Sequence, residues 1–313
     1  MMNQMNQKNE RVSTQLPIHG ILLVDKPTGK TSNGVLQQVK RLFQAQKAGH
    51  TGSLDPLASG MLPICFGKAT KFAQYLLDSD KHYITEATLG ITTSTGDLEG
   101  EILQERPVAK MTEAALECVL DKFRGPLVQV PPMYSALKHQ GKPLYQLARQ
   151  GVEVDRKKRE VFIHQLTLLE RRENKLLLEV VCSKGTYIRT LVEDIGKSLL
   201  CGATVSALHR KNVATFSQCP MYSLEALEKI QKEQGQKGLD ELLLPMTHAL
   251  HCLPSLVITR TEGSYLQQGR SFKLQQAIPQ GLVRLLLPTG QAMGVGEVDE
   301  KGKIHCMQMF HGL

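Results

Sequence analysis

The chain has 313 residues, 41% of them hydrophobic, and a net charge of +8, which supports one large core plus a smaller unit because single cores rarely grow beyond about 250–300 residues. The positive charge favours a polyanionic partner such as nucleic acid, although ordinary solubility accounts for it equally well. The seven cysteines lie at least eighteen positions apart, which excludes a zinc pattern and a disulfide framework. The sequence contains no run of about eighteen apolar residues that could span a membrane. We therefore expect a soluble cytoplasmic protein.

The first predicted elements are a tail, a strand and a helix. Residues 1–16 are polar, and we expect them to be disordered because their composition buries almost nothing. Order begins at His19, with an apolar strand over 20–25. Ser32 is then expected to cap a helix that runs to about Phe43 and carries its apolar residues on one face.

The segment from Gly49 to Gly60 is predicted to be a loop, because three glycines and a proline can neither continue a helix nor hold a central strand. Its one acid, Asp55, precedes Pro56, which favours an extended backbone at the acid. A carboxylate held out on a stiff turn suits a nucleophile. The alternative is a turn in which the aspartate only caps its own backbone.

Periodic segments continue from there to residue 244. We predict helices at 69–76, 112–123 and 191–200, one or two helices within 224–244, and strands at 83–89, 160–169, 176–182 and 203–210. Between 125 and 151 lies a long irregular stretch that carries Lys138, His139, Lys142 and Arg149. Loops of that length are usually functional or mobile. It is interpreted as a flap over RNA, with a solvated surface excursion as the alternative.

A change of pattern near residues 245–254 indicates a second unit. Short apolar segments beyond it are separated by Gly and Pro, which favours a small β-barrel. The predicted strands cover 256–259, 282–287, 292–298 and 303–309.

The most informative motif is the run Lys47-Ala48-Gly49-His50-Thr51-Gly52-Ser53-Leu54-Asp55-Pro56-Leu57-Ala58-Ser59-Gly60-Met61-Leu62-Pro63. It resembles the catalytic segment of the TruB family, the bacterial tRNA pseudouridine synthases that modify uridine 55 of the T loop. Further matching blocks are Lys81-His82-Tyr83, Lys142-Pro143-Leu144-Tyr145 and Lys184 to Thr190. The resemblance covers the chain from about His19 to its C-terminus.

The resemblance implies an α+β architecture. After the tail at 1–16, residues 17–248 are expected to form a pseudouridine synthase domain, a mixed β-sheet flanked by helices. Residues 249–313 are expected to form a small β-barrel similar to the PUA type of RNA-binding domain, of which Gln268-Gly269-Arg270 resembles one loop. Neither a metal nor an organic cofactor is expected, because the reaction oxidises nothing and imports no group.

The resemblance also assigns the chemistry. Asp55 corresponds to the catalytic nucleophile, and Arg189 to the arginine that pairs with it. A nearby cation lowers the pKa of a carboxylate, by about 1–3 units, and so would keep Asp55 ionised against the effect of burial. Tyr83 corresponds to a tyrosine that stacks on the target base, and its alternative is a core aromatic on a half-buried strand.

Other positions match residues around the substrate. Tyr187 and Leu208 resemble residues that line the base pocket, and His50 matches a histidine that fills the place of flipped nucleotides; a loop histidine bonded only to backbone is the alternative. His209 departs from the family pattern, which commonly has arginine there, so a phosphate contact could be weaker or pH-dependent. RNA contacts are expected from Lys26, Lys138, Lys142, Arg149 and Arg210.

The expected partner is the T arm of tRNA, bound by a monomer. Two other functions stay open on sequence grounds. One is a non-catalytic RNA-binding or tRNA-folding protein on the same fold, and the other is the same chemistry on another RNA.

Overall fold

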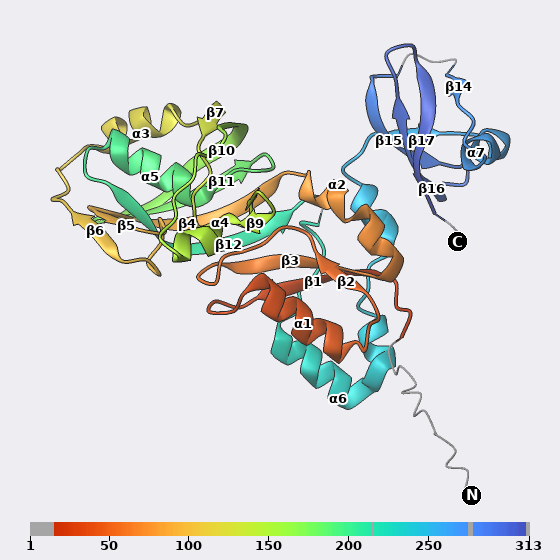
Figure 1. Cartoon of the computed structure of the whole chain (residues 1–313), viewed down its shortest axis with the longest axis horizontal. Helices are drawn as coiled ribbons and strands as arrows, with labels where there is room; N and C mark the ends of the chain where they lie inside the picture. Colours follow the sequence, from red (N-terminus) through yellow and green to blue (C-terminus); the bar gives the residue numbers. More distant parts are fainter. Residues whose placement is uncertain (1–15, 215, 275–277, 311–313) are drawn as a thin grey trace, which may run out of the picture.

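The computed structural model describes residues 16–214, 216–274 and 278–310. Figure 1 shows a wide sheet with helices and, at its C-terminal end, a separate small β unit. The predicted tail at 1–16 lies outside the described residues apart from Leu16. None of the helices in the described ranges combines the length and the apolarity that crossing a membrane requires.

An eight-stranded mixed sheet forms the larger unit, as predicted. The strand order is β1-β3-β12-β4-β11-β10-β7, with β2 added to β3. All neighbours are antiparallel except β12 and β3. The strands are β1 (Gly20–Lys26), β2 (Ala48–His50), β3 (Ser59–Phe66), β4 (Lys81–Leu89), β7 (Gly125–Gln129), β10 (Arg159–Arg172), β11 (Lys175–Cys182) and β12 (Ala203–Val213).

The parallel contact between β3 and β12 consists of two residue pairs, His209 with Ser59 and Arg210 with Gly60. It joins the β1–β3 part of the sheet to the part that holds β4, β11 and β10. Gly60 has a φ of +98°, and a Cβ there would lie 2.3 Å from the Arg210 carbonyl oxygen. Only glycine fits this close approach of two backbones.

Helices cover the two parts of the sheet separately (Figure 1). Helices α3 (Glu113–Asp121) and α5 (Ile188–Ser198) bury their apolar faces in one core with β4, β11 and β12. Helices α1 (Ser32–Leu42) and α6 (Leu224–Asp240) share a second core with β1 and β3. α6 contains a kink at Gly235, where φ is +65°, so the segment predicted as one or two helices is two helices that meet at this residue.

The cap of α1 differs from the prediction. Thr31 is the N-cap, and its side chain accepts a hydrogen bond from the Gly34 N–H. Ser32 is buried instead, and its hydroxyl donates to the Leu54 carbonyl at 2.9 Å and accepts from the Leu54 N–H at 2.7 Å. The serine therefore ties the helix to the loop that carries Asp55.

Two regions are more regular than predicted. Strand β3 was not expected, because Gly60 and Pro63 are breaker residues, yet nearly all of it is buried. The stretch from 125 to 151, predicted to be irregular, contains β7, a small hairpin and a helix. Shorter elements of this unit are η1 (Gly67–Phe72), α2 (Ala73–Leu77), β5 (Ile91–Thr93), β6 (Ile102–Glu105), β8 (Lys138–His139), β9 (Lys142–Pro143) and α4 (Leu144–Arg149).

The C-terminal unit is a five-stranded sheet of order β13-β15-β16-β17-β14. Among the described residues no pairing joins β13 to β14, so the predicted barrel is a curled, open half-barrel. A helix, α7 (Arg260–Gln267), was missed in the sequence although Thr259 and Glu262 form a capping box. The strands are β13 (Ser255–Val257), β14 (Phe272–Lys273), β15 (Gly281–Leu286), β16 (Ala292–Val298) and β17 (Lys303–Met309).

The two units share a buried interface. Phe310, next to β17, lies with its ring centroid 4.5 Å from that of Phe72 in η1. Val295 of β16 belongs to the same apolar cluster as Ile21 of β1. The proposed boundary after residue 248 falls inside η2 (Met246–Leu250), which is packed in this cluster.

Candidate active site

The loop that carries Asp55 is anchored at both ends. It connects β2 to β3, which pair with each other from Ala48 with Phe66 to His50 with Ile64. Ser32 binds both backbone groups of Leu54, directly before the acid. The predicted loop is therefore shorter than expected, spanning residues 51–58, and Asp55 projects from a fixed base.

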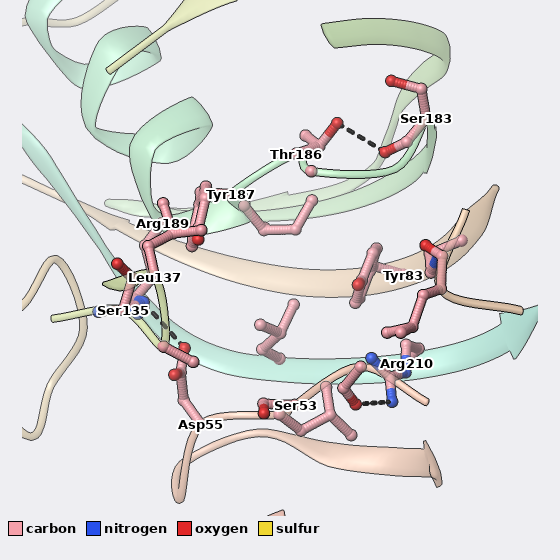
Figure 2. Close-up of a pocket in the computed structure, with 18 of the residues that line it drawn as sticks. Ser53, Asp55, Tyr83, Ser135, Leu137, Ser183, Thr186, Tyr187, Arg189 and Arg210 are labelled. Atoms are coloured by element: carbon pink, nitrogen blue, oxygen red, sulfur yellow. Dashed lines mark hydrogen bonds and ion pairs between the residues drawn. The ribbon is translucent and has the colours of Figure 1, made fainter. Parts of the chain in front are cut away.

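A cavity of about 480 Å³ opens beside Asp55 (Figure 2). Its walls come from the Asp55 loop, from β4 and β12, from residues 183–189 and from residues 135–137. The structure brings together at this cavity all six residues that the sequence placed around the reaction: His50, Asp55, Tyr83, Tyr187, Arg189 and Leu208.

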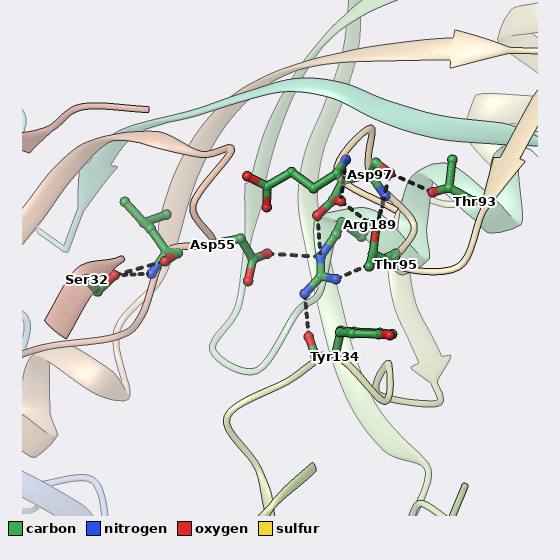
Figure 3. A network of polar contacts seen from close by, with 9 residues as sticks. Ser32, Asp55, Thr93, Thr95, Asp97, Tyr134 and Arg189 are labelled. Carbon is green, nitrogen blue, oxygen red and sulfur yellow. Dashed lines mark hydrogen bonds and ion pairs between the residues drawn. The ribbon is translucent and has the colours of Figure 1, made fainter. Parts of the chain in front are cut away.

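Arg189 makes the central ion pair of the site (Figure 3). Its Nε lies 2.9 Å from Oδ2 of Asp55, and its side chain is only 5% exposed. Its two terminal nitrogens donate to the carbonyls of Thr95 at 2.6 Å and Tyr134 at 2.7 Å. Because every nitrogen of the guanidinium has a partner, its orientation toward Asp55 is fixed.

A second carboxylate lies behind the pair. Oδ2 of Asp97 is 3.7 Å from Nε of Arg189, and the Asp97 side chain is 4% exposed. Its other oxygen accepts hydrogen bonds from the Thr95 hydroxyl and the Glu99 N–H. The sequence did not single out this residue, because an acid in an Asp-Leu-Glu-Gly stretch is typical of a surface turn.

The surroundings of Asp55 shift its pKa in opposite directions. Burial raises the pKa of Asp55 above its ordinary value, Arg189 lowers it, Asp97 raises it and Lys26 lowers it. The predicted pairing with Arg189 is present, but burial outweighs it in the net direction of the pKa. The carboxylate remains accessible, since 39% of the Asp55 side chain is exposed.

Two further side chains shape the cavity. Tyr83, 9% exposed, lies on β4 opposite Val180 of β11 and Arg210 of β12, and burial raises the pKa of its hydroxyl. Nδ1 of His50 is buried without a hydrogen-bond partner. Burial, with Arg210 adding to it, lowers the pKa of His50, which favours a neutral ring.

Three family models match the chain in succession. They are the TruB family pseudouridylate synthase N-terminal domain at residues 40–188, the tRNA pseudouridylate synthase B C-terminal domain at 189–251, and the pseudouridine synthase II TruB C-terminal domain at 254–309. The tRNA pseudouridine synthase B of Coxiella burnetii is 51% identical over 288 residues, 92% of this chain and 93% of that protein. The chain belongs to the TruB family of pseudouridylate synthases.

Other comparisons agree with the TruB assignment. The tRNA pseudouridine synthase B of Nitrosococcus oceani is 50% identical over 95% of this chain and 96% of its own length. A solved Cbf5-Nop10-Gar1 complex contains a chain with a TM-score of 0.74 and 26% identity, covering 94% of this chain and 85% of that chain. As a member of the TruB family the chain is an enzyme, an isomerase with the pseudouridine synthase fold.

Two of the cations expected to contact RNA in this TruB chain, Lys26 and Arg210, are buried. Lys26 is fully buried, and its Nζ donates to the carbonyls of Pro27 at 2.8 Å, Lys30 at 2.6 Å and Pro56 at 3.3 Å. Burial lowers its pKa to about 8. An ammonium that binds three carbonyls inside the protein offers no charge to RNA at the surface. Lys26 instead fixes the residue that follows Asp55.

Arg210 is also buried, with 1% exposure. Its Nε donates to the Met61 carbonyl at 2.7 Å and its Nη2 to the Gly52 carbonyl at 3.1 Å. It lines the cavity from β12 (Figure 2) and braces the start of the Asp55 loop. Any contact of Arg210 with RNA would therefore be made inside the cavity, and it stays a prediction.

The remaining predicted RNA contacts are at the surface. Lys138, Lys142 and Arg149 are exposed on the segment after β7, and the Arg149 guanidinium lies 5.7 Å from the ring centroid of Tyr145. Their contact with RNA stays a prediction. His209, at the position where arginine was expected, has its Nδ1 2.9 Å from the Ser59 hydroxyl, so it links β12 to β3.

Proposed function

We propose that this protein converts uridine 55 in the T loop of tRNA to pseudouridine, with Asp55 as the nucleophile. The proposal rests on one observation above all: the carboxylate of Asp55 and the buried guanidinium of Arg189 meet at 2.9 Å beside a cavity of about 480 Å³. Relatives that are about half identical over nearly their whole length are named tRNA pseudouridine synthase B, which supports tRNA as the substrate.

The reaction breaks the N1–C1′ bond of uridine, turns the base, and joins C5 to C1′. The proton on C5 is lost and N1 ends protonated, so atoms and electrons balance without a further reactant. A carboxylate suits this chemistry because it can add to an electron-poor carbon and leave again, as in retaining glycosidases. Arg189 lowers the pKa of Asp55 and so opposes the protonation that partial burial favours.

The reacting carbons cannot be reached while the base is stacked in a folded loop, so the nucleotide must be extruded, at a cost of a few kcal/mol. The cavity lies within the range of about 300–1,000 Å³ that is usual for small-molecule sites. Tyr83, Tyr187 and Leu208 present apolar surface to a base inside it. A neutral His50 ring, with its unpaired Nδ1, suits the space that the extruded nucleotide leaves.

Binding of the T arm is assigned to surfaces around the cavity. Lys138, Lys142 and Arg149 are exposed cations on the segment whose first residues, 135–137, line the cavity wall. The C-terminal half-barrel would add further contacts with the sugar-phosphate backbone of the RNA. Phosphate contacts of this kind supply affinity that falls with salt.

The test is a map of pseudouridine in tRNA after incubation with the purified protein, beside an Asp55→Asn variant. We expect one new pseudouridine, at position 55, with the parent protein. The variant, which removes the charge at nearly constant shape, should bind tRNA within a small factor of the parent and form no product. Pseudouridine at another position or in another RNA alone would refute the substrate, and substantial turnover by the variant would refute the role of Asp55.

A further inference from the structure

A buried glutamine lies behind the active site. Gln129 is the last residue of β7 and is 3% exposed. Its Oε1 accepts a hydrogen bond from the N–H of Tyr187 at 3.0 Å, and its Nε2 donates to the carbonyl of Tyr187 at 3.3 Å. One side chain thus occupies both backbone groups of one residue, as a neighbouring strand would.

Tyr187 is the point at which the chain enters α5. It occupies the N-cap position with φ −102° and ψ 110°, and its side chain makes no capping hydrogen bond. Gly185, two residues earlier, has a φ of +78°. The backbone direction at the start of α5 is therefore not fixed by a cap from the helix itself, and the amide of Gln129 supplies the missing constraint.

Arg189 follows Tyr187 by two residues, in the first turn of α5. Its three nitrogens reach Asp55, Thr95 and Tyr134, so a small shift of the helix start would move the guanidinium away from all three. We propose that Gln129 is a positioning residue for the isomerisation, which holds the backbone of Tyr187 so that Arg189 meets Asp55. This inference rests on the function proposed above.

The same contact connects the RNA-facing segment to the reaction centre. Residues 130–137 follow Gln129 directly; the carbonyl of Tyr134 accepts from Arg189, and Ser135 lines the cavity. The segment after β7 is thus bound to α5 at Tyr187 and again at Arg189. Contacts that RNA makes with this segment would reach the ion pair through the hydrogen bonds between the Gln129 side chain and the Tyr187 backbone and between the Arg189 side chain and the Tyr134 carbonyl.

The pH dependence of the reaction provides a specific readout. The titratable groups that interact with Asp55 are Arg189 from α5, Asp97 and Glu99 from the turn after β5, Lys26 from β1, and the hydroxyls of Tyr83 on β4 and Tyr187 before α5. Arg189 lowers the pKa of Asp55 and Asp97 raises it. If Arg189 moves away, the pKa of Asp55 rises, so the ionised form is lost at a higher pH and the acid limb of the rate profile shifts upward.

The test compares Gln129→Met with Gln165→Met. Methionine keeps the length of the side chain and removes both hydrogen bonds. Gln165 makes the matched control, because it is an exposed glutamine of the same sheet with side-chain partners Thr167 and Glu179. Single-turnover rates at saturating enzyme are measured against pH with a T-arm stem-loop, together with binding of that RNA and amide exchange at Tyr187.

For Gln129→Met we expect a rate about a hundredfold lower, as for a misplacement of about 1 Å in an active site. Binding should stay within about threefold, the acid limb should move to higher pH, and the Tyr187 amide should exchange faster. Gln165→Met should match the parent in every measurement. A parent-like rate, or a lower rate with an unmoved acid limb, would overturn the inference.

Gln129→Glu decides the matter if the methionine variant does not fold at the assay temperature. An ionised glutamate retains an acceptor for the Tyr187 N–H, but it loses the donor and sets a buried negative charge against the Tyr187 carbonyl oxygen, so we expect a loss of rate at a pH where the glutamate is ionised. A glutamate variant equal to the parent in rate and in Tyr187 exchange would also overturn the inference. Absence of product from the parent protein itself would instead refute the proposed function, whereas exchange at Tyr187 tests the contact independently of activity.

Discussion

Replacement of Phe310 by alanine tests whether the C-terminal unit shares a hydrophobic core with the larger unit. Phe310 is 7% exposed, Phe72 is 2% exposed, and their ring centroids are 4.5 Å apart. A Phe→Ala change in a core costs about 3–5 kcal/mol, against a total stability of about 5–15 kcal/mol for a typical domain. The matched control is Met307→Ala on β17, where the side chain is 50% exposed and the expected change is within about 0.5 kcal/mol.

The assay is urea unfolding followed by circular dichroism, with the single-turnover rate measured in the absence of urea. With a slope of about 3 kcal/mol per M, the midpoint of Phe310→Ala should fall by roughly 1 to 1.7 M. Because both units share the cluster, the parent should unfold in one transition. The rate of the folded variant should remain near that of the parent, since Phe310 does not line the cavity.

The same interface predicts the behaviour of a truncation after Thr247. Deletion would remove Leu250, Val295 and Phe310 and expose Phe72 and Ile21, which are now 2% and 0% exposed. Exposure of each such side chain costs about 1.5–3 kcal/mol, so we expect the truncated chain to unfold or aggregate. A loss below about 1 kcal/mol in Phe310→Ala, well under the usual cost of such a change, or a truncation with the parent midpoint, would refute a shared core.

Three other changes have defined outcomes. Tyr83→Phe should retain base stacking and Tyr83→Ala should lose it, a difference of about 1–3 kcal/mol in the single-turnover barrier; parent-like rates for both variants would exclude a pocket role. Lys26→Met leaves buried carbonyls unpaired, which should lower the free energy of unfolding by about 1–3 kcal/mol. It also removes a charge that lowers the pKa of Asp55, so the acid limb of the rate profile should shift to higher pH rather than stay in place. Lys138→Ala with Lys142→Ala should weaken tRNA binding and lower the salt slope by about 1 for each contact, an effect that binding titrations at several salt concentrations would reveal or exclude.

Local patterns predicted much of the fold. The central strands, α3 and α5 follow from their apolar periodicity, and the mixed sheet confirms the predicted fold class. Strand β3 was missed because Gly60 and Pro63 are breakers in isolation, whereas in the sheet Gly60 permits the approach of β12. Helix α7 was missed because its sequence is polar, although its capping box was readable from Thr259 and Glu262.

Some residues of the candidate site were predicted from the sequence and others were not. Asp55, Tyr83 and Arg189 were found through a dense motif and its matching blocks. The burial of Lys26 and Arg210 was not predicted, because a cation in a basic protein suggests a surface charge. The carbonyls that enclose each one converge only after folding. Gln129 and Asp97 carry no sequence signal of their own, since their partners lie 58 and 92 positions away.

The parallel contact of two residue pairs between β3 and β12 lies close to the candidate active site. Asp55 belongs to the segment that leads into β3, whereas Arg189 is on the helix that leads into β12. The carboxylate of Asp55 and the guanidinium of Arg189, which form an ion pair, are thus carried by the two parts of the sheet that this contact joins. A residue larger than glycine at position 60 would push β3 and β12 apart, because its Cβ would meet the Arg210 backbone. Such a protein would keep every side chain of the candidate site and still separate Asp55 from Arg189, so a substitution outside the cavity could disrupt the site.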